Sequence, residues 1–292
     1  MQSLVRVVNA AGMMVLPVLL GVYLARRTRA SWPLFAAGAG TFLFSQLLHL
    51  PFNRFLLLPG LEAGGFGVDG DIQTQLLFAL ALGLSAGVFE EFSRYIVLRF
   101  GAKSARDWKS ALMFGAGHSG VEAFLLGGIA LAALIQVSAY NTPAYLNSLP
   151  EDQRSLLVSQ IELYWSIPWA TALLGLVERV FALCFHISAA VLVMQVFLRR
   201  NNWWLLAAVL WHTLLDATAV LINIRAGAFA AEGALAGLTV ISALIIFTLR
   251  PVSSEGTTPS EQVSPEQPDQ SPVPRVPENT RIQERINDSR YE

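Results

Sequence analysis

Ionisable side chains occur inside several long apolar segments of this chain. They are Glu90, Glu91, Arg94, His118, Glu122, Glu178, Arg179, His186, His212 and Asp216. A charged side chain at the centre of a bilayer costs about 2.5–3.5 kcal/mol on insertion scales, so membrane-spanning segments rarely keep such residues without a use. Carboxylates and imidazoles can bind a metal ion or transfer protons. The pattern therefore points to chemistry carried out within a membrane.

The spacing of two histidines and two carboxylates brings them together in pairs. His118 precedes Glu122 by four residues, and His212 precedes Asp216 by the same interval. On an α-helix this spacing stacks both side chains of a pair on one face. Each pair can therefore reach one point, and imidazole with carboxylate is a ligand set that Zn²⁺ accepts. The alternative is an interhelical hydrogen bond that only holds the helices together.

Four of the ionisable residues are expected at a similar depth below one membrane surface. The helix ends at this surface are marked by Arg99, Lys109, Arg199 and Asn202. The four residues lie about 8–13 positions inward from these ends, and they are Glu91, His118, His186 and His212. At a rise of about 1.5 Å per residue they share a layer roughly 12–20 Å below the surface. Four helices can thus converge on one site, with His186 as a further candidate ligand.

The adjacent glutamates Glu90 and Glu91 are expected to have different roles, because neighbouring residues point about 100° apart around a helix. One can face the site as a general base, while the other pairs with Arg94 on the next turn. The sequence leaves open which of the two is the base. The alternative for both is a carboxylate that snorkels to the membrane interface.

Two other features are interpreted as structural. His49 stands beside Pro51 at the predicted outer end of its segment, where we expect an interfacial residue. Glycines give one apolar segment a small-residue surface that favours close helix packing, at Gly115, Gly117, Gly120, Gly127 and Gly128.

The composition indicates what kind of fold holds these residues. The chain has 292 residues, of which 54% are hydrophobic and 14% charged, whereas a soluble domain carries about 25% charged residues. Segments near the length of a membrane span recur at roughly 4–25, 32–51, 73–98, 110–137, 166–198, 203–224 and 227–249. The predicted fold is all-α, a polytopic transmembrane helix bundle of about seven spans. A connecting helix within 148–165 has one apolar face and is expected to lie along the membrane surface.

Charge bias predicts the orientation of the bundle, because Lys and Arg favour cytoplasmic loops. Basic clusters at 26–29, 99–109 and 199–200, together with Arg250, fall on one side of the predicted spans. We therefore expect the N-terminus outside and the C-terminus in the cytoplasm. Residues 1–250 are predicted to form the transmembrane bundle, and 251–292, rich in Pro, Ser, Glu and Gln, a disordered cytoplasmic tail.

The remaining composition limits partners and redox chemistry. The formal net charge of −1 does not suit a nucleic-acid partner, whose phosphates call for a basic surface. Cys184 is the only cysteine, so no internal disulfide can form.

Four of the ionisable stretches carry a resemblance to a known family. They read EEFSRY, GAGHSGVEAF, ERVFALCFHIS and HTLLDA, each on its own predicted span. In this order the sequence resembles the YhfC-type family of intramembrane metalloproteases, which is related to the CAAX-protease and bacteriocin-processing group and to the PrsW-type proteases. The resemblance spans Thr74 to Val220. CAAX-type enzymes separate the second glutamate and the arginine by three residues, whereas Glu91 and Arg94 are separated by two, as in the PrsW-type pattern.

The resemblance implies a multi-pass protein of a bacterial plasma membrane in which a glutamate activates water beside metal-binding histidines. The implied catalytic residues are Glu90, Glu91 and Asp216, and the implied metal-binding residues are His118, Glu122, His186 and His212. The implied cofactor is a divalent metal, Zn²⁺.

The leading hypothesis is a metal-dependent endopeptidase that cuts a membrane-associated peptide or protein near the cytoplasmic side. One rival is a proton-coupled transporter, since buried Glu, His and Asp also form proton relays, although no internal repeat supports it. The other rival is a non-catalytic scaffold of the same fold. The bilayer and the substrate are the expected partners, and the oligomeric state is left open.

Overall fold

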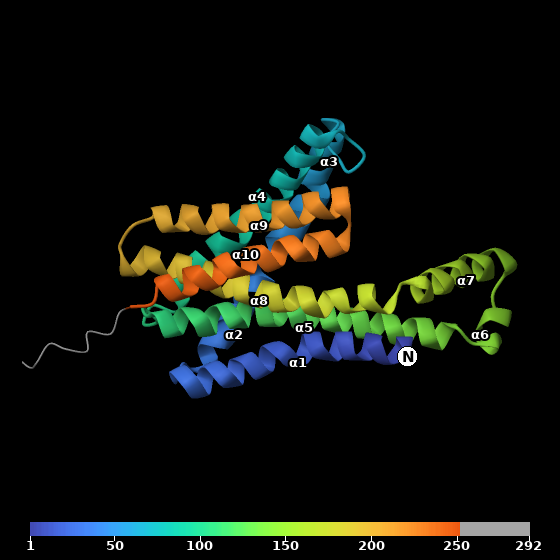
Figure 1. The fold of residues 1–292 in the computed structure, drawn as a ribbon, viewed down its shortest axis with the longest axis horizontal. Helices are drawn as coiled ribbons and strands as arrows, with labels where there is room; N and C mark the ends of the chain where they lie inside the picture. The colour runs from blue at the N-terminus through green and yellow to red at the C-terminus, as the bar shows by residue number, and fades with distance from the viewer. Residues whose placement is uncertain (252–292) are drawn as a thin grey trace, which may run out of the picture. The chain divides into compact units, whose positions relative to one another are not determined.

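The computed structural model describes residues 1–251, and every regular element within that range is helical (Figure 1). The elements are α1 (Gln2–Thr28), α2 (Trp32–Phe52), η1 (Asn53–Leu57), α3 (Leu58–Ala63), α4 (Ile72–Ile96), η2 (Val97–Gly101), α5 (Trp108–Tyr140), α6 (Pro143–Asn147), α7 (Glu151–Ser166), α8 (Trp169–Leu198), α9 (Trp203–Ala226) and α10 (Ala228–Thr248). The predicted all-α fold is confirmed. The predicted tail lies, from residue 252 onward, outside the described residues.

Within residues 1–251, seven helical segments are long and apolar enough to cross a membrane. They are Gln2–Thr28, Trp32–Ala63, Ile72–Gly101, Trp108–Tyr140, Trp169–Leu198, Trp203–Ala226 and Ala228–Thr248. The predicted number of spans is therefore confirmed, and the chain is a multi-pass integral membrane protein.

The second span is longer than predicted. The expected end at residue 51 is wrong, because the helix continues past Pro51 through the π-helical turn η1 into α3. A proline removes one backbone donor but does not by itself end a membrane helix, since local π adjustments satisfy the freed backbone groups again. As a result, His49 lies well inside the helical segment instead of at its end.

The helices pack as a bundle in which α5 and α8 are central. Both α1 and α2 pack against α5, α5 packs against α8, and α10 packs against α8 and α9. The closest partner of α4 is α9. Gly83 and Gly87 allow this approach, because a Cβ atom at Gly87 would lie 2.8 Å from the Val209 carbonyl oxygen. This contact brings the glutamates of α4 beside the histidine of α9.

The predicted small-residue surface of α5 is confirmed at most of its positions. A Cβ atom at Gly115 would lie 2.7 Å from the Cα atom of Ile187 on α8, and one at Gly117 would overlap the backbone of Phe35 on α2. Gly120 and Gly127 are also close to neighbouring helices, whereas Gly128 faces open space. The glycines therefore set the spacing of α5 from its neighbours.

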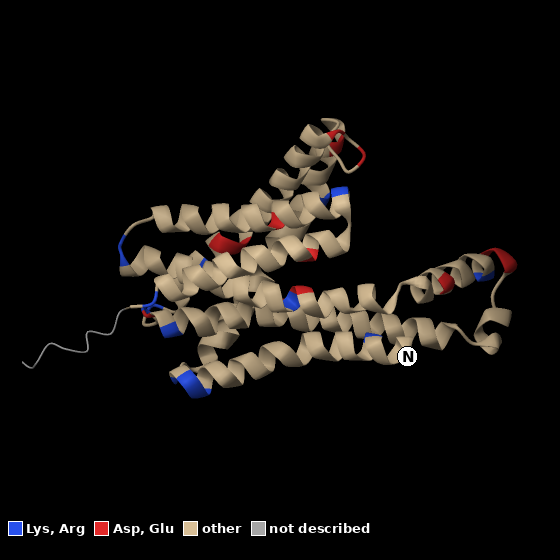
Figure 2. Cartoon of the chain, in the orientation of Figure 1, with Lys and Arg blue, Asp and Glu red and all other residues tan. Residues whose placement is uncertain are grey.

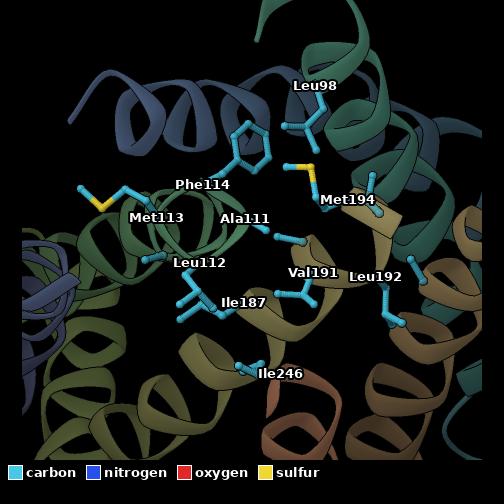
Figure 3. Packing of buried hydrophobic residues seen from close by; sticks show 14 of the residues in the cluster. Leu98, Ala111, Leu112, Met113, Phe114, Ile187, Val191, Leu192, Met194 and Ile246 are labelled. Atoms are coloured by element: carbon cyan, nitrogen blue, oxygen red, sulfur yellow. The ribbon is translucent and has the colours of Figure 1, made fainter. Parts of the chain in front are cut away.

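An apolar cluster fills one part of the bundle next to the polar residues (Figure 3). Its fully buried members come mainly from α5 and α8 and include Phe114, Met113, Val191, Val193 and Met194. Leu98 of η2 also reaches this cluster and is fully buried. Side chains in such a cluster interlock closely, so the cluster fixes the positions of the helices that also carry His118 and His186.

Basic residues gather at one end of the helices, the left end in Figure 2. The C-terminal end of α1 carries Arg26 and Arg27, and the α8–α9 connection carries Arg199 and Arg200. The loop between η2 and α5 lies at the same end, because Arg106 from this loop stacks over the ring of Phe197 near the end of α8. The basic loops thus share one side, as predicted. That this side faces the cytoplasm stays a prediction.

The predicted connecting helix is confirmed as α7, and its position along the membrane surface stays a prediction. One side of α7 contacts the bundle, because Ile161 is buried, while Leu156 is exposed. Arg6 of α1 donates a hydrogen bond of 2.6 Å to the Tyr164 carbonyl and lies over the rings of Tyr164 and Trp165. These contacts attach the end of α7 to α1.

Candidate functional site

Two adjacent glutamates of α4 are buried and have different surroundings. Glu91 is fully buried, and its Oε1 atom pairs with Arg94 and lies 2.7 Å from Nδ1 of His212. Glu90 is 6% exposed, and its Oε1 atom accepts a hydrogen bond from Gln46 of α2. The Oε2 atom of Glu90 faces three histidines, as described below. The sequence predicted that the two carboxylates would differ, and this geometry is consistent with that prediction.

Each of three buried histidines is held by a partner through one ring nitrogen. The Nδ1 atom of His118 lies 2.8 Å from the Thr41 hydroxyl. The Nδ1 atom of His212 lies 2.7 Å from Glu91 Oε1. The Nε2 atom of His186 lies 2.9 Å from Glu122 Oε2. Partners of this kind orient the imidazole ring and fix which nitrogen carries the proton, as they do for histidines that bind metals.

The other nitrogen of each ring is turned toward one atom, Oε2 of Glu90. The distances to this atom are 3.0 Å from His118 Nε2, 4.0 Å from His186 Nδ1 and 3.9 Å from His212 Nε2. Glu90, His186 and His212 also form a group whose potential ligand atoms lie within 4.8 Å of one another. Ligand atoms around a tetrahedral Zn²⁺ are about 3.3 Å apart, given bond lengths near 2.0–2.1 Å. The donor types therefore fit a divalent metal, which would draw these ligand atoms closer together.

The proton positions in this cluster also favour a cation. The Thr41 hydroxyl donates to the Gly38 carbonyl, so it accepts from Nδ1 of His118 and leaves Nε2 without a proton in the neutral ring. Glu91 likewise accepts from Nδ1 of His212. When both rings are neutral, two nitrogen lone pairs therefore face the Glu90 carboxylate. Such an arrangement of acceptors is stable only with a proton or another cation between them.

Arg94 is a fully buried cation at the edge of the cluster. It pairs with Glu91, lies 3.5 Å from Glu90 Oε2 and donates a hydrogen bond of 2.7 Å to His186 Nδ1. Its charge offsets part of the negative charge of the two glutamates. Because it contacts the inward nitrogen of His186, this nitrogen can bind a metal only if the guanidinium shifts.

Glu122 and Asp216 occupy different places around the histidines. Glu122 forms an ion pair of 2.7 Å with Arg179, which also pairs with Glu178. Glu122 thus contacts His186 through the nitrogen that is turned away from Glu90. Asp216 lies 3.4 Å from His212 Nε2, and its side chain is 32% exposed. Asp216 is therefore the more accessible of the two carboxylates.

A cavity of about 110 Å³ lies directly beside the cluster. Its lining includes Glu122, His186 and Asp216. A second cavity of about 400 Å³ shares three lining residues with it, Glu178, Ala219 and Leu235. The larger cavity also includes Asn223 and Glu232, near the α9–α10 connection. Two adjoining cavities therefore lie between the cluster and the ends of the helices opposite the basic loops.

Two polar residues of α2 at the cluster were not expected from the sequence, and a third was expected elsewhere. Thr41 and Gln46 contact His118 and Glu90 directly. His49, expected at the interface, is instead buried, stacks on Phe89 and bonds to Asn53. The interfacial expectation was wrong because Pro51 does not end the helix. Polar residues inside an apolar span are themselves a signal of interhelical contacts, and this signal could have identified all three.

Comparison with known proteins gives the family. Residues 12–237 match the family described as YhfC intramembrane metalloprotease. The chain is 32% identical over 209 residues to a protein named "Uncharacterized membrane protein YhfC" from Bacillus subtilis (strain 168), which covers 70% of this chain and 79% of that protein. No solved structure matches the chain. The family match extends well beyond the four motifs that carried the resemblance in the sequence. The chain therefore belongs to the YhfC intramembrane metalloprotease family.

Proposed function

We propose that this protein is a metal-dependent endopeptidase that hydrolyses a membrane-associated peptide or protein. One observation carries the proposal: three histidines, each held by a partner through one nitrogen, turn the other nitrogen toward Glu90 Oε2 at 3.0–4.0 Å. The family description, which names an intramembrane metalloprotease, supports the same reading. In this proposal His118, His186 and His212 hold the metal.

The metal in the proposal is Zn²⁺, because three imidazoles are a common ligand set of catalytic zinc sites. When bound, the ion supplies a Lewis acid that polarises the carbonyl of the peptide bond to be cut. For His186 to contribute, Arg94 must give up its hydrogen bond to Nδ1. Arg94 can then keep its contacts with Glu90 and Glu91, which balance its charge.

Glu90 is the general base in this proposal. Its Oε2 atom lies 3.0–4.0 Å from the inward nitrogens of the three histidines, so it is within reach of a water molecule held beside them. Glu90 takes a proton from the water as the oxygen attacks the carbonyl carbon. It then gives the proton to the amine that leaves when the C–N bond breaks.

Two of the other predicted site residues act through their neighbours. Glu91 orients His212, and Glu122 orients His186, each by contact with the outward nitrogen. We therefore propose Glu91 as a positioning residue instead of the base, and Glu122 as a positioning residue instead of a metal ligand. Asp216 faces the adjacent cavity and is placed to accept a hydrogen bond from the attacking water or from the substrate.

Water and substrate enter, in this proposal, through the two cavities that share Glu178, Ala219 and Leu235. The larger cavity ends near the α9–α10 connection, on the side opposite the basic loops. Entry from this side differs from the cytoplasmic cut expected from the sequence. The larger cavity is lined by the carboxylates Glu178 and Glu232. These favour a substrate that is basic or neutral and polar near the bond to be cut.

The first test is the metal content of the purified full chain, measured by mass spectrometry in detergent. We expect close to one Zn²⁺ per chain in the wild type and less than about a tenth of that in His118→Ala and in His212→Ala, because each substitution removes one ligand. His49→Ala is the matched control, since His49 is the remaining histidine and contacts Asn53 outside the cluster.

Circular dichroism and gel filtration must show that all four proteins are folded. Cleavage of a reconstituted library of membrane-inserted peptides should be lost with the metal and kept in His49→Ala. A folded, metal-free wild type that moves protons across a vesicle membrane would instead favour the transporter. A folded wild type with neither metal nor transport would favour the scaffold.

A further inference from the structure

A groove separate from the cavities beside the histidine cluster lies among four helices, on the side of the basic loops. It has a volume of about 370 Å³. Its lining comes from α1, α5, α8 and α10 and comprises Tyr23, Leu24, Arg27, Thr28, Trp108, Lys109, Leu112, Ile187, Ile246, Phe247 and Arg250. This lining contains three cations and no carboxylate. The groove plays no part in the proposed peptidase mechanism.

The floor of the groove is apolar. Leu24, Leu112, Ile187 and Ile246 are each buried to more than nine-tenths and belong to the apolar cluster. Figure 3 shows Leu112, Ile187 and Ile246 at one edge of this cluster, on three different helices. A hydrocarbon chain laid on this floor would contact aliphatic side chains only.

The rim of the groove is cationic. Arg27, Lys109 and Arg250 are exposed and come from three different helix ends. Within residues 1–251 none of these three side chains forms an ion pair or a side-chain hydrogen bond. The guanidinium of Arg250 lies 5.4 Å from the centre of the Trp108 ring, which holds it over the groove. Three uncompensated positive charges in one place favour a ligand that carries a phosphate.

Trp108 holds together two of the helices that form the groove. Its indole Nε1 donates a hydrogen bond of 2.8 Å to the Ile246 carbonyl, so α5 and α10 are joined across the groove. Tyr23 also lines the groove, and 60% of its surface is exposed. Tryptophan and tyrosine are typical of the level at which lipid headgroups lie.

We propose that this groove binds one anionic phospholipid, with the phosphate at Arg27, Lys109 and Arg250 and an acyl chain on the apolar floor. Basic pockets between transmembrane helices are suited to anionic headgroups. A zwitterionic headgroup carries its own cation, which the three basic residues repel. The lining residues Tyr23 and Phe247 are exposed on helices long enough to span the membrane, so a lipid can enter from the membrane.

The test is lipid binding by native mass spectrometry of the delipidated full chain. We expect dioleoyl phosphatidylglycerol to bind at least about tenfold more tightly than dioleoyl phosphatidylcholine. In the triple variant R27Q/K109Q/R250Q the two lipids should bind equally. The matched control R26Q/K103Q/R200Q removes three exposed cations from the same end of the bundle but none from the groove. It should keep the preference.

Two outcomes would overturn the proposal. If the control loses as much of the preference as the groove variant, the effect comes from the general positive field and not from this groove. The other outcome combines two results. The wild type binds both lipids equally, and carbodiimide links Lys109 to a carboxylate of residues 252–292. That result would assign the groove to the chain's own C-terminal segment.

Discussion

The polar cluster around Glu90 and the apolar cluster beside it share two helices, α5 and α8. On α5, Phe114 lies in the apolar cluster, and one helical turn later His118 lies in the polar one. On α8, His186 and Ile187 are neighbours that belong to different clusters. A membrane supplies little hydrophobic driving force between helices, so close packing stabilises the apolar cluster. The polar cluster instead places two carboxylates and an arginine where burial is unfavourable.

The difference indicates a division of labour along each helix. The apolar cluster fixes the spacing and rotation of α5 and α8, and it contains no group that can transfer a proton. The polar cluster depends on that fixed spacing, because its contacts join five helices: α2, α4, α5, α8 and α9. We therefore expect substitutions in the polar cluster to change activity without changing stability. Substitutions in the apolar cluster should change stability without changing activity.

The largest expected effect is that of Glu90→Gln on cleavage. We expect a loss of about 10²–10⁴-fold, because glutamine has nearly the same shape but cannot accept the proton from water. Zinc content should stay close to that of the wild type, since the proposed ligands are histidines. Cleavage would be measured on a peptide identified from the library, and zinc by mass spectrometry of the same sample. A variant that keeps more than about a tenth of the activity would rule out Glu90 as the base.

Met194→Ala tests the apolar side of the comparison. Met194 is fully buried in the apolar cluster, and truncation leaves a cavity that neighbouring side chains only partly fill. We expect a loss of about 2–4 kcal/mol in the free energy of unfolding, with the zinc content per folded molecule unchanged. Unfolding would be followed by circular dichroism in mixed micelles with increasing denaturing detergent.

Leu244→Ala is the control for this substitution, because Leu244 lies on α10 with 57% of its surface exposed. It should change stability by less than about 0.5 kcal/mol. If Met194→Ala removes zinc from molecules that remain folded, the two clusters are not separable in the way proposed here.

The sequence predicted much of the fold and part of the candidate site. Apolar length predicts membrane spans, because the bilayer allows few alternatives, and all seven were found. The i, i+4 spacing predicted that His212 and Asp216 approach each other, and they lie 3.4 Å apart. His118 and Glu122 share the same spacing, yet they contact different partners, Glu90 and His186. Spacing along one helix places two side chains on one face but does not determine which neighbouring helix each one meets.

Residues from α2 show where prediction from the sequence ended. Thr41 has a short polar side chain that can bond to a carbonyl of its own helix, as it does at Gly38, and Gln46 has a long flexible one whose partner the sequence does not indicate. Only the packing of α2 against α5 and α4 turns them toward His118 and Glu90. The end of this span was also misplaced, since the π-helical turn after Pro51 is a local adjustment that no periodicity in the sequence indicates.

Thr41→Val gives the smallest expected effect and the sharpest test of how the polar cluster is organised. Valine keeps the shape of the side chain and removes the hydroxyl that accepts from Nδ1 of His118. We expect zinc affinity to fall about tenfold, because the ring loses the contact that fixes its orientation and its proton. Competition with a chelator of known affinity would measure the change. Thr248→Val is the control, since the Thr248 hydroxyl bonds only to carbonyls of its own helix. Equal zinc affinity in both variants would mean that packing alone orients His118, and the distinction between the two clusters would then be weaker than the contacts suggest.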